Sequence, residues 1–163
     1  MQVKAEKTPI TEGIKYALPE IDFIDTFSTT NHQDDLYCIS NLIFGTMPNW
    51  VEILIKLRNT IVKIFGLKTE KPEDFNTTCI VGGYVGFFQI FSIQENEIIL
   101  GADDKHLNFR VSIYDSDEKQ FNIKVTTLVQ YNNRFGKIYM AIIKPLHLPI
   151  IKSMIKQAYK SDT

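Results

Sequence analysis

The sequence predicts an α+β domain in which a curved antiparallel sheet surrounds a long C-terminal helix. Apolar residues recur at helical spacing early in the chain, and from about residue 84 their period changes to two. Short polar gaps separate the later runs, which indicates antiparallel neighbours, because parallel crossovers need roughly a dozen residues. An amphipathic segment closes the chain and supplies the helix that an apolar sheet face requires.

Length and composition are those of one globular domain. The chain has 163 residues, of which 44% are hydrophobic and 23% charged, and a chain of this size buries enough surface for a core. Residues 1–18 show no clear period and are predicted to form an N-terminal arm. Residues 19–163 are predicted to form a single domain.

Charge and cysteine content exclude several classes of protein. Lysine and arginine number 18 against 19 aspartates and glutamates, a formal net charge of −1, so we expect no nucleic-acid partner. Cys38 and Cys79 lack a CxxC spacing and are expected to be buried, unpaired side chains. The first residues lack a signal-peptide core, and no apolar run approaches the roughly 18 residues of a membrane span. We therefore expect a cytoplasmic protein without a membrane span.

The chain before residue 67 predicts one strand and two helices. Partial alternation over 21–27 predicts the strand. A first helix is predicted before Gly45, because apolar residues at helical spacing follow three candidate N-cap side chains, Thr29, Thr30 and Asn31. A second helix is predicted from Thr46 or Met47 to Phe65, with Pro48 near its first position and Gly66 just past its end.

The second half of the chain predicts a meander and a closing helix. Five strands are predicted near 84–93, 97–102, 106–114, 121–130 and 137–144. The closing helix is predicted from about Leu148 to Lys160, with Pro149 in its first turn, and its apolar residues are Ile151, Met154, Ile155 and Ala158. A curved sheet wrapped around such a helix is the helix-grip arrangement, which leaves a ligand-sized cavity between helix and sheet.

The predicted strand 106–114 separates polar from apolar side chains completely. Alternation places one set on each face of the sheet: His106, Asn108, Arg110, Ser112 and Tyr114 against Leu107, Phe109, Val111 and Ile113. Either the polar face is simply solvated, or it forms a binding or interface patch made of Asp104, His106, Asn108 and Arg110. A catalytic role has less support, because no nucleophile with an adjacent base is evident.

Further candidates lie outside this strand. His147 precedes the predicted closing helix, where it either caps or packs, and the sequence lacks the ligand spacing of a metal site. Gly82, Gly83 and Gly86 are interpreted as turn or bulge glycines, because no helix follows them. The candidate ligand-binding residues are therefore Asp104, His106, Asn108, Arg110, Tyr114, His147, Trp50 and Arg58. No catalytic residue, metal or cofactor is predicted.

Several segments together resemble one family. They are 21–27, Pro48-Asn49-Trp50, Leu57-Arg58-Asn59, Gly66-Leu67-Lys68, Gly101 to Arg110 and Pro145-Leu146-His147. They resemble an uncharacterised bacterial domain family, found as stand-alone proteins or fused to short-chain-dehydrogenase-like proteins. It is similar to the helix-grip superfamily of START domains, birch-pollen-allergen-like proteins and polyketide cyclases. Leu146 replaces an expected Phe and Asn108 an expected Asp, which weakens acid–base chemistry on the polar face.

The resemblance implies a fold rather than an activity, and three functions follow from the predicted architecture. The first is binding of a small apolar or amphipathic ligand between the sheet and the closing helix. The second is a cyclase, hydrolase or isomerase using the same cavity, which requires His106, Asp104 or Arg110 to point inward. The third is a homo-oligomeric interaction module using the polar face of strand 106–114. Monomer and homodimer are both consistent with the sequence, which does not decide which face of this strand meets the helix.

Overall fold

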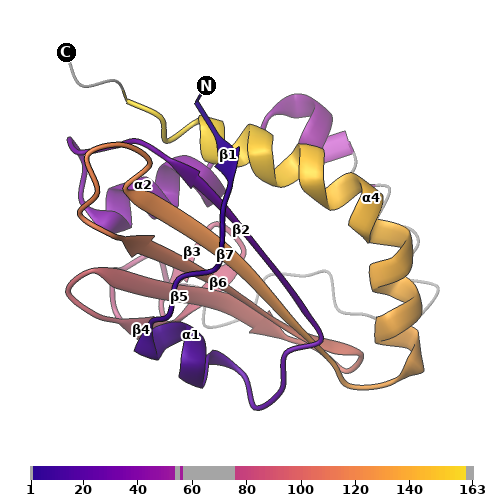
Figure 1. Cartoon of the computed structure of the whole chain (residues 1–163). Helices are drawn as coiled ribbons and strands as arrows, with labels where there is room; N and C mark the ends of the chain where they lie inside the picture. The colour runs from indigo at the N-terminus through magenta and orange to yellow at the C-terminus, as the bar shows by residue number, and fades with distance from the viewer. Residues whose placement is uncertain (1, 54–55, 57–75, 161–163) are drawn as a thin grey trace.

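The chain folds as one antiparallel sheet with helices on both faces (Figure 1). A computed structural model describes residues 2–53, 56 and 76–160. Its elements are β1 (Lys4–Ala5), α1 (Glu12–Ala17), β2 (Phe23–Thr29), α2 (Leu36–Phe44), β3 (Tyr84–Val85), β4 (Phe88–Ile93), β5 (Glu97–Asp103), β6 (Leu107–Asp115), β7 (Ile123–Tyr131) and α4 (Arg134–Lys156). The seven strands lie in the order β1-β2-β7-β6-β5-β4-β3. The predicted α+β class with a meander and a long C-terminal helix is confirmed.

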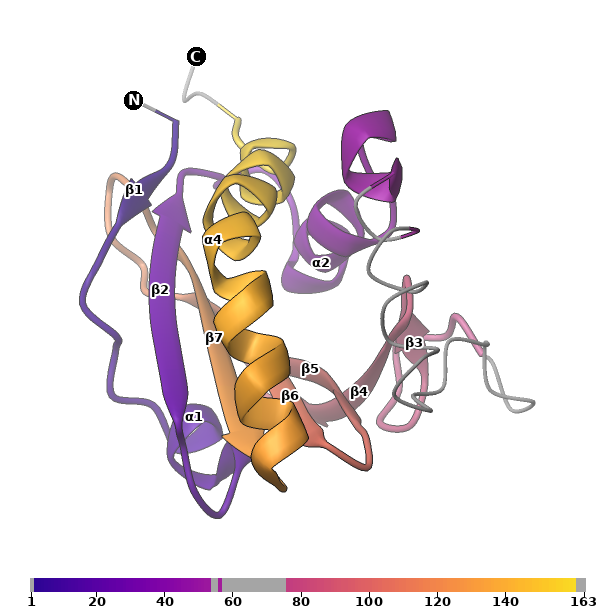
Figure 2. The same cartoon turned by 90° about the vertical axis from the view of Figure 1, so that its right-hand side faces the viewer.

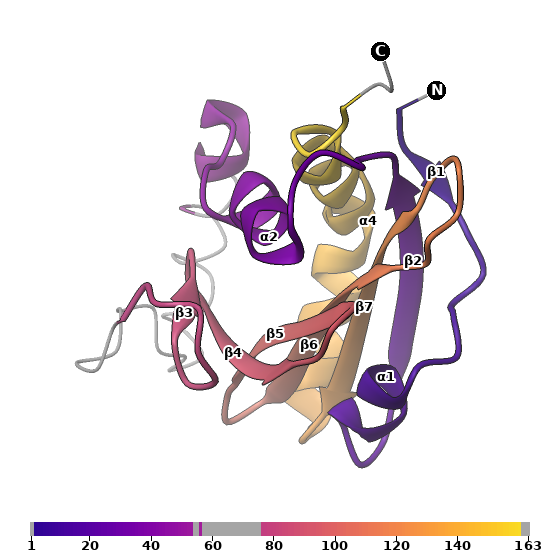
Figure 3. The ribbon, with the colours of Figure 1, turned by 90° about the vertical axis from the view of Figure 1, so that its left-hand side faces the viewer.

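The two faces of the sheet carry different helices. Figure 2 shows α4 and α2 in front of the curved sheet, and Figure 3 shows α1 on the opposite side. We call the face beneath α2 and α4 the inner face and the other the outer face. On β6, Val111 and Ile113 belong to the inner core, whereas Arg110 is opposite Leu128, which packs on α1. The apolar set of strand 106–114 therefore meets the C-terminal helix.

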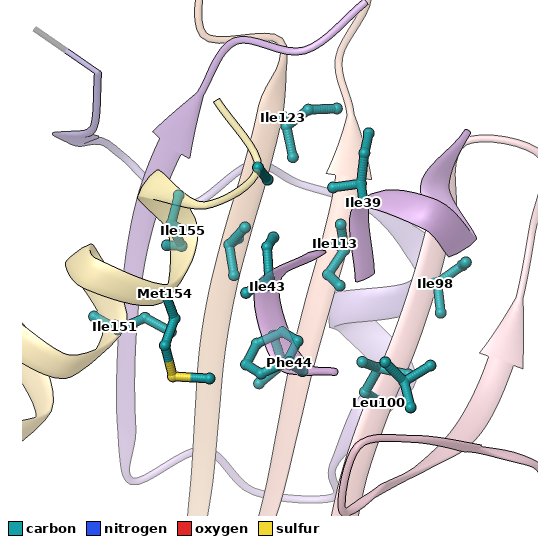
Figure 4. Packing of buried hydrophobic residues seen from close by; sticks show 14 of the residues in the cluster. Ile39, Ile43, Phe44, Ile98, Leu100, Ile113, Ile123, Ile151, Met154 and Ile155 are labelled. Atoms are coloured by element: carbon teal, nitrogen blue, oxygen red, sulfur yellow. The ribbon is translucent and has the colours of Figure 1, made fainter. Parts of the chain in front are cut away.

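The inner core joins α2, α4 and the middle strands (Figure 4). Ile43, Ile113 and Ile155 are fully buried at 0% exposure. Figure 4 shows these side chains converging from α2, β6 and α4. The predicted apolar residues of the closing helix, Ile151, Met154, Ile155 and Ala158, are all buried. Burial of such side chains stabilises a fold by roughly 1.5–3 kcal/mol each, so this cluster fixes the C-terminal half of α4 on the sheet.

The predicted strand 137–144 is wrong, because these residues form the first part of α4. The helix begins after its N-cap Asn133, whose side-chain oxygen accepts hydrogen bonds from the backbone N–H groups of Phe135 and Gly136 at 3.0 and 3.2 Å. Runs rich in β-branched residues are ambiguous between strand and helix. Pro145 and Pro149 lie inside the helix, on exposed positions. Proline on the solvent side of a helix bends it toward the core, and α4 curves over the sheet (Figure 1).

Other early elements differ in detail from the prediction. The first helix begins at Leu36 with Asp35 as its N-cap, and Gly45 ends it as predicted. Residues 49–53 and 56 are helical, and the rest of the predicted second helix lies outside the described residues. Both cysteines are exposed rather than buried.

The predicted strand 84–93 is divided at Gly86, which has a φ of 59°. A Cβ at this position would lie 2.3 Å from the Phe44 carbonyl oxygen, so both conformation and space require glycine. The chain therefore turns here, between β3 and β4, and passes close to the end of α2.

The predicted N-terminal arm is docked on the domain. Its strand β1 pairs with β2, and Ile14 of α1 packs with Leu18 and Leu128 on the outer face. Thr11 caps α1 by accepting a hydrogen bond from the Ile14 backbone N–H at 3.1 Å. These contacts cover part of the outer face that would otherwise be solvated.

Buried amides fix the segment after α4, up to Lys160, beside the connection between β2 and α2. The Asn122 carboxamide accepts from the Asn31 N–H and donates to the Asn31 carbonyl, both at 3.0 Å. Asn31 Nδ2 donates to the Ala158 carbonyl at 2.8 Å. Lys160 then forms an ion pair with Asp34 at 2.7 Å. The segment after α4 is therefore attached to the β2–α2 connection.

The Asp34–Lys160 pair should make stability depend on pH. The hydrogen bond from Lys160, followed by that from Asn31, holds the pKa of Asp34 below its ordinary value. The pair therefore stabilises the fold above the unfolded pKa of about 3.9, and this contribution disappears as pH falls through the lower folded pKa. Asp34→Asn should lower the free energy of unfolding at pH 7 by about 1 kcal/mol or less. Urea denaturation from pH 7 to pH 2 should show a shallower acid decline in Asp34→Asn than in wild type. The exposed Asp117→Asn should leave the decline unchanged, and an equal effect of both variants would contradict the assignment.

Candidate functional site

Arg110 lies on the outer face with its charge already satisfied. Its side chain is buried and donates to Asp103 Oδ1 at 2.7 Å and to the Phe109 carbonyl at 2.9 Å. The guanidinium lies 3.6 Å from the centre of the Phe91 ring. An ion pair combined with cation–π stacking is a stable structural arrangement for arginine. Arg110 is therefore not positioned to hold a ligand under α4.

His106 and Asn108 connect β6 to the start of α4. The carboxamide of Asn133 meets His106 Nδ1, which lies 2.9 Å from Asn133 Nδ2 and 3.1 Å from Asn133 Oδ1. Asn108 Oδ1 accepts from Asn132 Nδ2 at 3.0 Å. Both residues position the helix terminus.

The remaining predicted candidates do not join these residues in one site. Asp104 is engaged through its backbone carbonyl, which accepts from Asn132 Nδ2 at 2.8 Å. Tyr114 lies at the other end of β6, opposite Lys124. Trp50 is half-exposed in the helical residues 49–53, and Arg58 lies outside the described residues. The cluster predicted from 104–114 is therefore divided between the two ends and the outer face of the sheet.

His147 is the candidate that lies on the inner face. It belongs to the middle of α4 rather than to a segment before the helix, because α4 begins earlier than predicted. Its Nε2 lies 3.0 Å from Asp25 Oδ2 on β2, and the side chains are 17% and 22% exposed. The Phe23 ring meets the imidazole edge-on at 5.8 Å between centroids. A histidine–carboxylate pair thus joins helix and sheet among apolar groups.

The sheet beside this pair contains a buried hydroxyl. Thr127 is opposite Asp25 in the β2–β7 register and is 2% exposed. Within the described part of the chain, its Oγ1 has no hydrogen-bond partner. A buried hydroxyl without a partner costs about 1–3 kcal/mol, so this atom is available to a ligand or a water. Asp25, Thr127 and His147 thus form a small polar centre, which we call the inner polar site.

Apolar side chains surround the inner polar site. Phe23 and Val129 are register partners on one side, and Phe109 is opposite Val129 on the next strand. Phe109 is only half-buried, and Ala102 beside it is exposed, so the sheet is less covered toward this end. Because Nε2 of His147 is directed at Asp25, its other ring nitrogen, Nδ1, is left to contact a ligand. The arrangement can hold one polar group of an otherwise apolar molecule.

Sequence reasoning missed Asp25, although a signal for it was present. Asp25 has the same parity as Phe23 and Phe27 and therefore interrupts the apolar face of the predicted strand. A charged residue on a buried face is a functional or structural exception. Thr127 gave no comparable signal, because threonine is common on strands.

Sequence reasoning also missed a buried carboxyl on the outer face. Glu97 is 1% exposed and accepts from Ser112 Oγ at 2.5 Å, Thr11 Oγ1 at 2.7 Å and the Gly13 N–H at 3.2 Å. These donors come from β6 and from the start of α1. Glu97 therefore attaches α1 to the sheet.

A hollow lies on the surface away from the inner polar site. An open hollow of about 360 Å³ lies between the start of the chain and the C-terminal half of α4, lined by Gln2, Val3, Lys152, Ser153 and Lys156. Among the described residues, no group of three or more His, Cys, Asp or Glu side chains is arranged to hold a metal ion.

Comparison with known proteins identifies a family but no characterised relative. The sequence model of a family described as "Protein of unknown function (DUF2867)" matches residues 17–154. Neither the curated proteins nor the solved structures gave a match. The match covers most of the chain, from the last residue of α1 to the last turns of α4.

Proposed function

The chain belongs to the DUF2867 family, whose description assigns no activity, and we propose that it binds a small, largely apolar ligand at the inner polar site. The ligand would lie between α4 and the strands β2, β7 and β6, with its apolar body against Phe23 and Phe109. Its single polar group would contact His147 or Thr127. Ligand sites are commonly apolar surfaces with a few polar groups that fix orientation.

The observation that carries the proposal is the 3.0 Å contact between His147 and Asp25 across an apolar surface. Such a pair contributes little to stability, because desolvation offsets the attraction between the partners. Its presence, together with the unsatisfied Thr127 hydroxyl, is therefore better explained by binding than by folding. Relation to the helix-grip superfamily would place the ligand in the same position, between sheet and helix.

The two alternatives have less support. The enzyme alternative required Asp104, His106 or Arg110 to face the helix, but Arg110 is on the outer face and His106 is hydrogen-bonded to the cap of α4. The interaction alternative required an accessible polar face on β6. Arg110 and Ser112 on that face are 7% and 0% exposed within the single chain.

Ligand screening of wild type and His147→Ala tests the proposal. Thermal shift and native mass spectrometry should use fatty acids, long-chain alcohols and aromatic acids as probes. A probe at roughly 100-fold excess over its Kd stabilises the folded state by about 2.7 kcal/mol, which raises Tm by roughly 5–10 °C. His147→Ala should reduce the affinity for that probe about tenfold, the effect of one lost hydrogen bond.

His32→Ala is the matched control, because His32 is an exposed histidine in the connection between β2 and α2, and its Nε2 lies 3.3 Å from the Lys119 carbonyl oxygen in the connection between β6 and β7. It should bind the probe as wild type does. The proposal is wrong if no probe stabilises the protein, or if neither His147→Ala nor Asp25→Asn changes the affinity for a probe that binds.

A further inference from the structure

The outward side of α4 carries a continuous apolar stripe. Phe135, Ile138, Ile142 and Leu146 follow one another at three- and four-residue steps, which places them on one side of a helix. They are 52%, 52%, 50% and 37% exposed. We call these four residues the α4 stripe. Scattered exposed apolar residues are ordinary, but a contiguous row is typical of an interaction surface.

The stripe is additional to the side of α4 that packs on the domain. The buried residues of the helix are Gly136, Met140, Ile151, Met154 and Ile155. At 100° per residue these side chains lie roughly opposite the stripe. By length and composition alone α4 could span a bilayer. Its inner side is instead packed in the core through Ile151, Met154 and Ile155, so the helix is suited to lie on a surface rather than to cross it.

The charge of α4 defines the surface that it fits. Its basic residues are Arg134, Lys137, Lys144, Lys152 and Lys156, and 134–156 contains no aspartate or glutamate. This is unusual in a chain whose net charge is −1. At 100° per residue these five basic residues fall on one side of the helix, and we call them the basic row. The ammonium groups of Lys144 and Lys152 lie over the Phe23 and Phe27 rings at 5.3 and 5.6 Å, so this side of the helix is the one toward β2. An apolar stripe beside a basic row is the pattern of helices that lie in anionic membrane interfaces.

We propose that the α4 stripe and its basic row dock on an anionic lipid bilayer. The apolar side chains enter the boundary between headgroups and acyl chains, and the basic row contacts the anionic headgroups. A second copy of this chain is a poorer occupant, because pairing two α4 stripes brings two rows of positive charge together. The site is separate from the inner polar site, which faces the opposite side of the helix.

Vesicle flotation with two lipid compositions tests the proposal. Wild type should float with phosphatidylcholine vesicles that contain phosphatidylglycerol and much less with pure phosphatidylcholine. Ile138→Ser/Ile142→Ser should lose most of the binding. Arg134→Glu/Lys137→Glu should reduce the partition coefficient roughly tenfold or more, since each basic residue contributes about fivefold near an anionic surface. These acidic replacements lie at a helix N-terminus, where negative charge is tolerated, so the variant should still fold.

Two matched controls separate specific docking from general surface effects. Ile80→Ser/Val81→Ser removes two side chains that are 50% and 62% exposed outside α4. Lys7→Glu/Lys119→Glu makes the same charge change at exposed positions outside α4. Both controls should float like wild type, as should His147→Ala, which separates this proposal from ligand binding at the inner polar site.

Three results would overturn the proposal. The first is that wild type floats with neither lipid composition. The second is that Arg134→Glu/Lys137→Glu floats as well as wild type. The third is that no vesicle binding is seen, while light scattering shows a concentration-dependent dimer that Ile138→Ser/Ile142→Ser abolishes. The last result would assign the stripe to contact between copies instead.

Discussion

Gly136→Ala should lower the free energy of unfolding by about 2–3 kcal/mol, although glycine-to-alanine changes inside helices ordinarily raise it by about 1 kcal/mol. A Cβ on Gly136 would lie 2.0 Å from the His106 carbonyl oxygen and 2.9 Å from its carbon. That carbonyl cannot easily move, because it accepts a hydrogen bond from the Asn132 N–H at 2.9 Å. The first turn of α4 must therefore shift away from β6.

Urea denaturation of Gly136→Ala and Lys137→Ala gives the comparison. Lys137 is exposed in the same turn, and its replacement should change stability by less than about 0.5 kcal/mol. Amide hydrogen exchange should also accelerate across the first turns of α4 in Gly136→Ala. A more stable Gly136→Ala protein would mean that helix propensity prevails and that the helix terminus does not contact His106 this closely.

Glu97→Ala should lower the free energy of unfolding by about 3 kcal/mol. The carboxyl is 1% exposed and receives hydrogen bonds from Ser112, Thr11 and Gly13. Each buried donor left without an acceptor costs roughly 1–3 kcal/mol, with the smaller values where water can enter. Ser112 is 0% exposed, so its hydroxyl should account for the largest part of the loss. Differential scanning calorimetry and urea denaturation measure the change.

Two variants make this prediction specific. Glu97→Gln keeps one acceptor oxygen for Ser112 and Thr11 and should lose less, about 1–2 kcal/mol, since its NH2 group replaces the oxygen that accepts from the Gly13 N–H. Glu95→Ala, an exposed neighbour, should be within about 0.5 kcal/mol of wild type. A loss below 1 kcal/mol in Glu97→Ala would show that α1 is held mainly by Ile14 and Leu18.

Residues 137–144 were predicted as a strand but form part of the helix α4. Lys137 to Lys144 contains the β-branched and aromatic residues of a strand, and Pro149 resembles the first turn of a new helix. The capping function of Asn133 was hidden, because asparagine and glycine at 132–136 are equally typical of a hairpin turn. Tertiary contacts decided between the two, since Gly136 fits against His106 only with the helix seated there.

The candidate site was predicted only in part. His147 was predicted as a candidate, although as a residue that precedes the helix. Its partner Asp25 was not predicted, because the two residues are 122 positions apart in the sequence. Asp104 and the polar residues of strand 106–114 are close in sequence, and this closeness predicted a single patch. In the folded chain these residues have separate roles. Arg110 stacks on Phe91, His106 contacts the N-cap of α4, and Tyr114 lies at the opposite end of β6.

The α+β class, the consecutive antiparallel strands from β4 to β7 and the apolar residues of the last helical turns could be predicted from the sequence, because local periodicity depends only on which side chains must leave water. Only the tertiary structure decided that the apolar side of β6 meets α4, that 137–144 is helical and that Asp25 meets His147. Each of these depends on contacts between distant segments, where two locally consistent arrangements exist and packing selects one.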